Sequence, residues 1–275
     1  MAVPKIYIVG VGPGDPDLLT VKADRLIRNA DIVLYTDSLI PPEIMAIARQ
    51  TASLITTADK NLEEMLALMT ASARLGLNVV RLHDGDPCLY GAIQEQMSGL
   101  LAAGLDFEVV PGVSAYQLAA ARLRVELTMP EQVQTIILSR MSGRTIVPDD
   151  EELSSLAAHR SSLCLYLSAK HIEQVESKLL LHYPPQTPVA ICFRLGWKDE
   201  KIVLVALSEL RIKNEELGMV RSTLYVISPA LMTNTVPKEF GYAERSEFSQ
   251  EVGRSQLYSS NLESGLLSLL VQDYS

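Results

Sequence analysis

Lys5-Ile6-Tyr7-Ile8-Val9-Gly10-Val11-Gly12-Pro13-Gly14-Asp15-Pro16 is the stretch that decides the fold of this chain. An apolar, β-rich run ends in glycine, and a polar turn leads into residues 18–30, whose apolar spacing is that of a helix. Further apolar runs at 32–35 and 78–82 follow the same rhythm. Strands that alternate with helices at this spacing indicate βαβ units and a mostly parallel sheet.

The rest of the pattern divides the chain into parts. Further helices are expected at 62–75, 93–103 and 172–181, and further strands at 107–110, 135–138, 163–167, 189–193, 201–205 and 224–227. The alternation of expected strands and helices changes around Pro130. The close spacing of the last expected strands favours a mixed sheet. We therefore expect an α/β protein with an N-terminal domain over 1–117, a C-terminal domain over 118–233 and a polar C-terminal extension over 234–275, including a short docking helix at 266–271.

Composition narrows the class of protein. The 275 residues are 48% hydrophobic and 21% charged, as in an ordinary folded chain. A formal charge of -9 repels polyanions, so we expect no nucleic-acid partner. No stretch approaches the roughly 18 apolar residues of a membrane span and no targeting signal is visible, so we expect no membrane association and a cytoplasmic location. Cys88, Cys164 and Cys192 are widely spaced, which fits reduced thiols.

The loop over 10–16 lies where a sheet commonly presents backbone amides to a ligand. It is not a phosphate-binding Walker loop, because no Lys-Ser/Thr pair follows. It is also a poor dinucleotide fingerprint, because Pro13 removes an amide donor. Asp37, about 20 residues beyond the loop, keeps a nicotinamide cofactor open as an alternative.

Two further loops end strands in the same manner. Asp84-Gly85-Asp86-Pro87-Cys88-Leu89-Tyr90-Gly91 brings glycines and two carboxylates to the end of the third expected strand. Pro111-Gly112-Val113-Ser114-Ala115 ends the fourth with small residues that allow a ligand to approach the backbone. Three such loops at one sheet edge predict a ligand site there.

These three loops, in this order and spacing, resemble the tetrapyrrole methylase family over about residues 5–230. The resemblance implies two α/β domains, an N-terminal mostly parallel sheet and a C-terminal mixed sheet, with the active-site cleft between them. It also implies S-adenosylmethionine as methyl donor and S-adenosylhomocysteine as product. The segments 127–135 and 139–148 are most similar to the branch of the family that methylates precorrin-4, metal-free or carrying cobalt, at carbon 11 during cobalamin synthesis.

The resemblance implies particular site residues. Cofactor contacts fall by position on small, apolar or loop residues: Pro13, Asp84, Gly85, Asp86, Ser114, Ala115, Leu167, Leu195 and Thr223. Because the substrate carries many carboxylates, arginines are its expected partners: Arg122, Arg124, Arg140 and Arg144. Glu95 is the candidate proton acceptor, although Ala92 stands where related methylases have an arginine.

The same residues are compatible with other functions. A sister methylase acting at another ring carbon shares the cofactor loops, and a nicotinamide-dependent oxidoreductase or a tetrapyrrole-binding protein without turnover uses the same edge. The histidines (His83, His159, His171 and His182) share no metal-ligand spacing, so no metal bound by the protein is expected. The family further implies a homodimer.

Overall fold

The computed structural model describes residues 6–143, 145–233 and 235–240. By the density of their internal contacts, these residues form two compact units. The first contains the chain up to Ala121 together with Cys192–Ile202 and Ser222–Leu224, and the second contains the remainder. The segment around Cys192–Ile202 therefore packs with the N-terminal half although it lies far along the chain.

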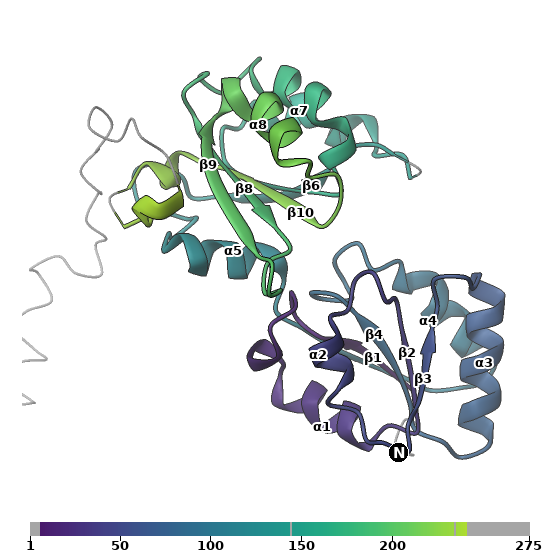
Figure 1. Ribbon diagram of the computed structural model, residues 1–275. Coiled ribbons are helices and arrows are strands. Elements are labelled where there is room, and N and C mark those ends of the chain that lie inside the picture. The colour runs from purple at the N-terminus through teal and green to yellow at the C-terminus, as the bar shows by residue number, and fades with distance from the viewer. Residues whose placement is uncertain (1–5, 144, 234, 241–275) are drawn as a thin grey trace, which may run out of the picture. The chain divides into compact units, whose positions relative to one another are not determined.

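The first unit is built on a five-stranded sheet in the order β3-β2-β4-β1-β5 (Figure 1). Every strand pair in this sheet is parallel. Its elements are β1 (Ile6–Gly10), α1 (Val21–Asn29), β2 (Ile32–Tyr35), α2 (Pro42–Met45), β3 (Ser53–Thr56), α3 (Leu62–Arg74), β4 (Val79–His83), α4 (Ile93–Ala102), β5 (Glu108–Val110) and the start of α5 (Ala115–Leu123).

Both faces of this sheet are covered, which explains why β1 is apolar throughout. Val9 lies in a core with Ile27 of α1 and Ile44 of α2. Ile6, on the opposite face, lies in a second core with Met69 of α3 and Leu100 of α4. Figure 1 shows the two helix pairs on opposite sides of the strands. The three glycine-containing loops follow β1, β4 and β5 and therefore lie together at the carboxyl edge of this sheet.

The second unit holds a sheet in the order β6-β7-β10-β8-β9, with β6 parallel and β10 antiparallel to β7. The elements of this part of the chain are β6 (Ile136–Arg140), α6 (Leu153–Ala157), β7 (Ser162–Tyr166), α7 (Ile172–Leu179), β8 (Pro188–Phe193), β9 (Lys201–Ala206), α8 (Leu210–Leu217) and β10 (Thr223–Ile227). One end of each of β8, β9 and β10, at 192–193, 201–202 and 223–224, belongs to the first unit. The helices α6, α7 and α8 pack in sequence against one another.

The predicted fold class, one mostly parallel and one mixed α/β sheet, is confirmed. The sequence pattern missed five elements: α2, β3, α5, α6 and α8. The helix expected over 18–30 begins only at Val21, because Thr20 caps it by accepting a hydrogen bond from the Ala23 N–H. The docking helix expected at 266–271 lies outside the described residues. Within the described ranges, no helix is long and apolar enough to cross a bilayer.

Candidate functional site

The first two glycine loops are joined through their backbones. The Gly12 N–H donates to the Gly85 carbonyl at 3.2 Å, and the Gly85 N–H donates to the Gly12 carbonyl at 2.8 Å. The Val11 N–H continues the ladder by donating to the His83 carbonyl at 2.9 Å. Two loops that lie far apart in sequence therefore form one structure, because β1 and β4 are parallel neighbours.

The third loop closes onto the same place. A Cβ added at Gly112 would lie 2.2 Å from the Gly85 carbonyl oxygen and 2.9 Å from the Gly10 carbonyl carbon, so only glycine fits. The Gly112 N–H donates to Asp86 Oδ2 at 3.0 Å, and Asp86 Oδ1 accepts from the Cys88 N–H at 2.8 Å. Both carboxylate oxygens of Asp86 thus brace the loops.

Ser114 and Ala115 follow directly at the start of α5. Ser114 is buried, and its N–H donates to Gln117 Oε1 at 2.8 Å while its carbonyl accepts from the Gln117 N–H at 3.1 Å. This reciprocal pair fixes the first turn of the helix beside the loops. A large side chain at Ser114 has no room without displacing them.

The structure brings most of the predicted cofactor residues into the first unit. Pro13, Asp84, Gly85, Asp86 and Ser114 lie on the three joined loops, and Ala115 begins α5 beside them. Leu195 and Thr223 are buried and belong to the same compact unit through its two later segments.

Leu167 is placed differently. It follows β7 in the second unit, is 60% exposed and has a φ of +52°. A β-branched or bulky residue pays for such a backbone conformation, and an exposed leucine gains little from burial in return. Its predicted cofactor contact stays a prediction.

Three buried polar side chains of β4 and α4 were not singled out from the sequence. Arg81, His83 and Gln96 are each more than nine-tenths buried, and each has side-chain atoms without a hydrogen-bond partner. Burial lowers the pKa of Arg81 to about 10, an effect that nearby Asp84 opposes. Burial, with the charge of Arg81, lowers the pKa of His83 to about 3, so His83 is neutral at physiological pH.

Two of these residues could have been predicted from the sequence of β4, Val79-Val80-Arg81-Leu82-His83. Arg81 and His83 occupy alternate positions of a fully buried strand and therefore share one face of the sheet. Asp84, the next residue, has an exposed side chain, yet desolvation by the surrounding loops raises its pKa and Arg81 counteracts the rise. Arg81, His83 and Asp84 thus place polar groups at the end of β4, directly before the second loop.

The predicted substrate arginines belong to the second unit. Arg122 and Arg124 are exposed at the end of α5 and just beyond it, and Arg140 ends β6. Arg144 lies outside the described residues.

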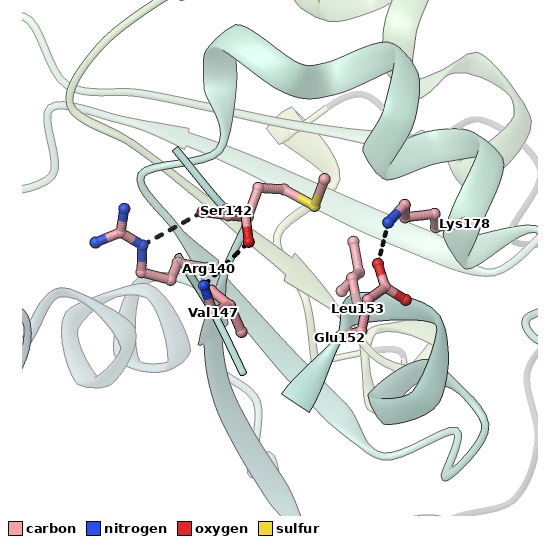
Figure 2. A pocket seen from close by; sticks show the side chains of 7 residues that line it. Arg140, Ser142, Val147, Glu152, Leu153 and Lys178 are labelled. Carbon is pink, nitrogen blue, oxygen red and sulfur yellow. Dashed lines mark hydrogen bonds and ion pairs between the residues drawn. The ribbon is translucent and has the colours of Figure 1, made fainter. Parts of the chain in front are cut away.

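Arg140 lines a small pocket of about 80 Å³ inside the second unit. Figure 2 shows Lys178 and Glu152 paired on one side of it and the Arg140 guanidinium pointing away on the other. Although desolvation favours the neutral form, hydrogen bonds from Lys178 and Ser154 hold the pKa of Glu152 at about 2. The charge of Lys178 is therefore paired within this pocket, and the role of Arg140 in substrate binding stays a prediction.

Glu95 lies in the first turn of α4, and its side chain is exposed. The residue before this helix, Ala92, has a left-handed backbone with φ of +50° and makes no side-chain cap. Acidic side chains are favourable at a helix N-terminus, which accounts for Glu95 without a chemical role. Its part as a proton acceptor stays a prediction. Within the described residues no group of three or more acidic, histidine or cysteine side chains could hold a metal ion.

Interlocked glycine loops at the carboxyl edge of a parallel sheet are typical of the class of α/β proteins that bind small ligands at this edge. The chain belongs to the tetrapyrrole (corrin/porphyrin) methylases, whose family model matches residues 5–211. The predicted family membership is thereby confirmed.

Individual relatives narrow the comparison. A precorrin-4 C(11)-methyltransferase of Pseudomonas aeruginosa is 39% identical over 246 residues, covering 90% of this chain and 96% of the relative. The X-ray structure of a cobalt precorrin-4 methyltransferase of cobalamin biosynthesis is 41% identical, with a TM-score of 0.80 over 82% of this chain and 95% of that one. A uroporphyrin-III C-methyltransferase from Thermus thermophilus, complexed with S-adenyl homocysteine, is 29% identical, with a TM-score of 0.68 over 81% of this chain and 96% of that one.

Proposed function

We propose that this protein transfers the methyl group of S-adenosylmethionine to carbon 11 of precorrin-4 or cobalt-precorrin-4 in cobalamin biosynthesis. The observation that carries the proposal is the three-loop edge of the first unit, in a chain about 40% identical to enzymes named for this reaction. Relatives named for the metal-free and for the cobalt-bearing substrate are similarly close, so both substrates are retained.

The loop edge fits a methyl donor of this kind. Gly112 allows the third loop to approach the backbones of Gly10 and Gly85, and Asp84 is exposed beside these joined loops. Asp84 is placed to accept hydrogen bonds from hydroxyl or ammonium groups. Each carboxylate oxygen of Asp86 already accepts a bond from a loop amide, Oδ2 from Gly112 and Oδ1 from Cys88. We assign Asp86 to bracing the loops and the other loop residues to contact with the donor.

The chemistry asks for alignment more than for acid and base. When bound, S-adenosylmethionine supplies a methyl group already activated by a sulfonium, and the new carbon–carbon bond forms as the sulfur–carbon bond breaks. The loops hold the donor rigidly, since Asp86 and the paired Gly12 and Gly85 amides fix them before binding. Holding the reacting atoms in line can supply most of the acceleration. The arginines at 122, 124, 140 and 144 bind substrate carboxylates in this proposal.

The first test is calorimetric titration with S-adenosylhomocysteine, which needs no unstable tetrapyrrole. We expect micromolar binding to the wild type, loss of binding in Ser114→Trp and weaker binding in Asp86→Ala. Ser98→Trp is the matched control, because Ser98 is exposed on α4 and its replacement leaves the loops intact. Binding that survives Ser114→Trp unchanged would move the cofactor away from this edge.

The second test locates the transferred methyl group. With a carbon-13 methyl donor, NMR of the product is expected to show the label at carbon 11. Label at another ring carbon would identify a sister methylase with the same cofactor site.

We further propose that the protein is a cytoplasmic homodimer. Sedimentation should then give a mass of twice 30.2 kDa, whereas the mass of one chain would exclude the dimer.

A further inference from the structure

Trp197 is the single tryptophan of the chain, and it stands in the segment Cys192–Ile202 that packs with the first unit. Its side chain is partly buried, and the segment connects β8 to β9. None of the roles assigned so far uses it. This large aromatic side chain packs against Gly14 of the first glycine loop.

The indole fills the space that Gly14 leaves open. A Cβ at Gly14 would lie 2.6 Å from Trp197 Cδ1 and 2.9 Å from Nε1, and Gly14 has a φ of +144° that other residues rarely adopt. The adjacent residue on the Trp197 side, Gly196, makes the reverse contact. A Cβ there would lie 2.7 Å from the Asp15 N and 3.1 Å from the Gly14 N. Two glycines therefore allow the cofactor loop and the tryptophan segment to meet backbone to backbone.

The indole is itself held in place. The Arg194 guanidinium carbon lies 3.9 Å from the centre of the Trp197 ring, within the range of a cation–π contact. Arg194 Nη1 also pairs with Asp199 Oδ2 at 2.6 Å, which fixes the guanidinium over the ring. The backbone N–H of Trp197 donates to the Arg194 carbonyl at 3.0 Å, which closes the turn that carries the ring. The ring is thus fixed from its own segment before it meets the loop.

We propose that Trp197 is a positioning residue for the methyl donor. By packing against Gly14, the indole holds the loop over 12–15 in the conformation that binds the donor. This inference rests on the function proposed above. A loop with glycines at 10, 12 and 14 loses much backbone entropy when ordered, and an indole that orders it beforehand removes that cost from binding. Because the ring restrains the loop without touching the reacting atoms, its removal weakens donor binding and leaves the chemical step largely intact.

The test compares Trp197→Leu with Trp197→Phe in the full chain. We expect Trp197→Leu to weaken S-adenosylhomocysteine binding about tenfold, equivalent to ~1.4 kcal/mol, and to raise the KM for S-adenosylmethionine with kcat within about twofold. Trp197→Phe keeps an aromatic ring against Gly14 and should restore affinity to within about threefold. A merely structural role would lower the melting temperature without separating KM from kcat.

Tryptophan emission gives a readout independent of activity, because all of it comes from Trp197. Titration with S-adenosylhomocysteine should change this emission saturably, with the same midpoint as calorimetry. If Trp197→Leu does not fold, Arg194→Met tests the same contact, with an expected red shift of emission and about threefold weaker binding. An unshifted emission and unchanged affinity in that variant would overturn the proposal.

The outcomes separate this inference from the function on which it rests. Wild-type affinity in Trp197→Leu, or emission that stays constant while calorimetry records binding, would overturn the role of Trp197 alone. A well-folded wild type that binds no S-adenosylhomocysteine would overturn the proposed function and this role with it.

Discussion

The two sheets of this protein differ in direction, and the difference determines where each can build a site. In the first unit β4, β1 and β5 are parallel neighbours, so the loops that follow them reach one edge and interlock through Gly12, Gly85 and Gly112. In the second unit β10 runs against β7, so their following loops leave at opposite edges. Parallel strands gather backbone groups for a cofactor, whereas the mixed sheet contributes single side chains such as Arg140.

Glycine substitutions test this contrast with the largest expected effect. Gly112→Ala places a Cβ 2.2 Å from the Gly85 carbonyl oxygen, so the backbone itself must move. We expect a loss of about 3 kcal/mol or more in the free energy of unfolding and loss of S-adenosylhomocysteine binding. Urea denaturation followed by circular dichroism, together with calorimetry, measures both.

The matched control is Gly143→Ala in the second unit. A Cβ at Gly143 meets only Arg140 Nη2 at 3.6 Å, an ordinary contact. The free energy of unfolding should change by at most about 0.5 kcal/mol. Equal effects of the two substitutions would mean that the loops of the first unit are no more tightly interlocked than a surface turn.

The pH dependence of stability tests the buried polar residues of β4, which lead directly into the second loop. The pKa of His83 is about 3 in the folded protein against 6.5 as its ordinary value, because burial and the charge of Arg81 disfavour the imidazolium. The His83 imidazole therefore binds a proton in the unfolded chain but not in the folded protein, and the free energy of unfolding falls as the pH drops below about 6.5. Between about pH 7 and pH 5 this loss amounts to about 2 kcal/mol. Denaturation curves at several pH values should show the decline.

His83→Leu should flatten this decline, because the substitution removes the titrating group and leaves Arg81 and Asp84 in place. His159→Gln is the control, since His159 is exposed in the second unit. A wild-type curve that is flat over this range would show that water or a partner reaches His83 in the folded protein.

The first sheet could be predicted from the sequence because β1 and β2 are apolar at nearly every position and β4 begins with two valines. The edge strand β3 was missed, since Ser53-Leu54-Ile55-Thr56 is short and half exposed and has no distinctive pattern. The positions of the three loops followed from a general rule about strand ends. Their interlock did not, because the bond from Gly112 to Asp86 and the contact of Trp197 with Gly14 join residues far apart in sequence. Such contacts depend on the assembled sheet and leave no local periodicity.

The smallest expected effect belongs to the charged pair of the second unit, Lys178 and Glu152. Their side chains are 34% and 35% exposed, so water screens the attraction. Lys178→Met should lower the free energy of unfolding by only about 0.5 kcal/mol, and about 1 M NaCl should reduce the difference from the wild type further. The carboxylate of Glu152 keeps a partner in that variant, because the Ser154 N–H donates to it at 2.7 Å and caps α6. Glu152→Ala removes that cap as well and should therefore cost about 1 kcal/mol more. A loss above about 2 kcal/mol in Lys178→Met, unchanged by salt, would show that the second unit also relies on a desolvated polar interaction, and the contrast with the interlocked loops of the first unit would no longer hold.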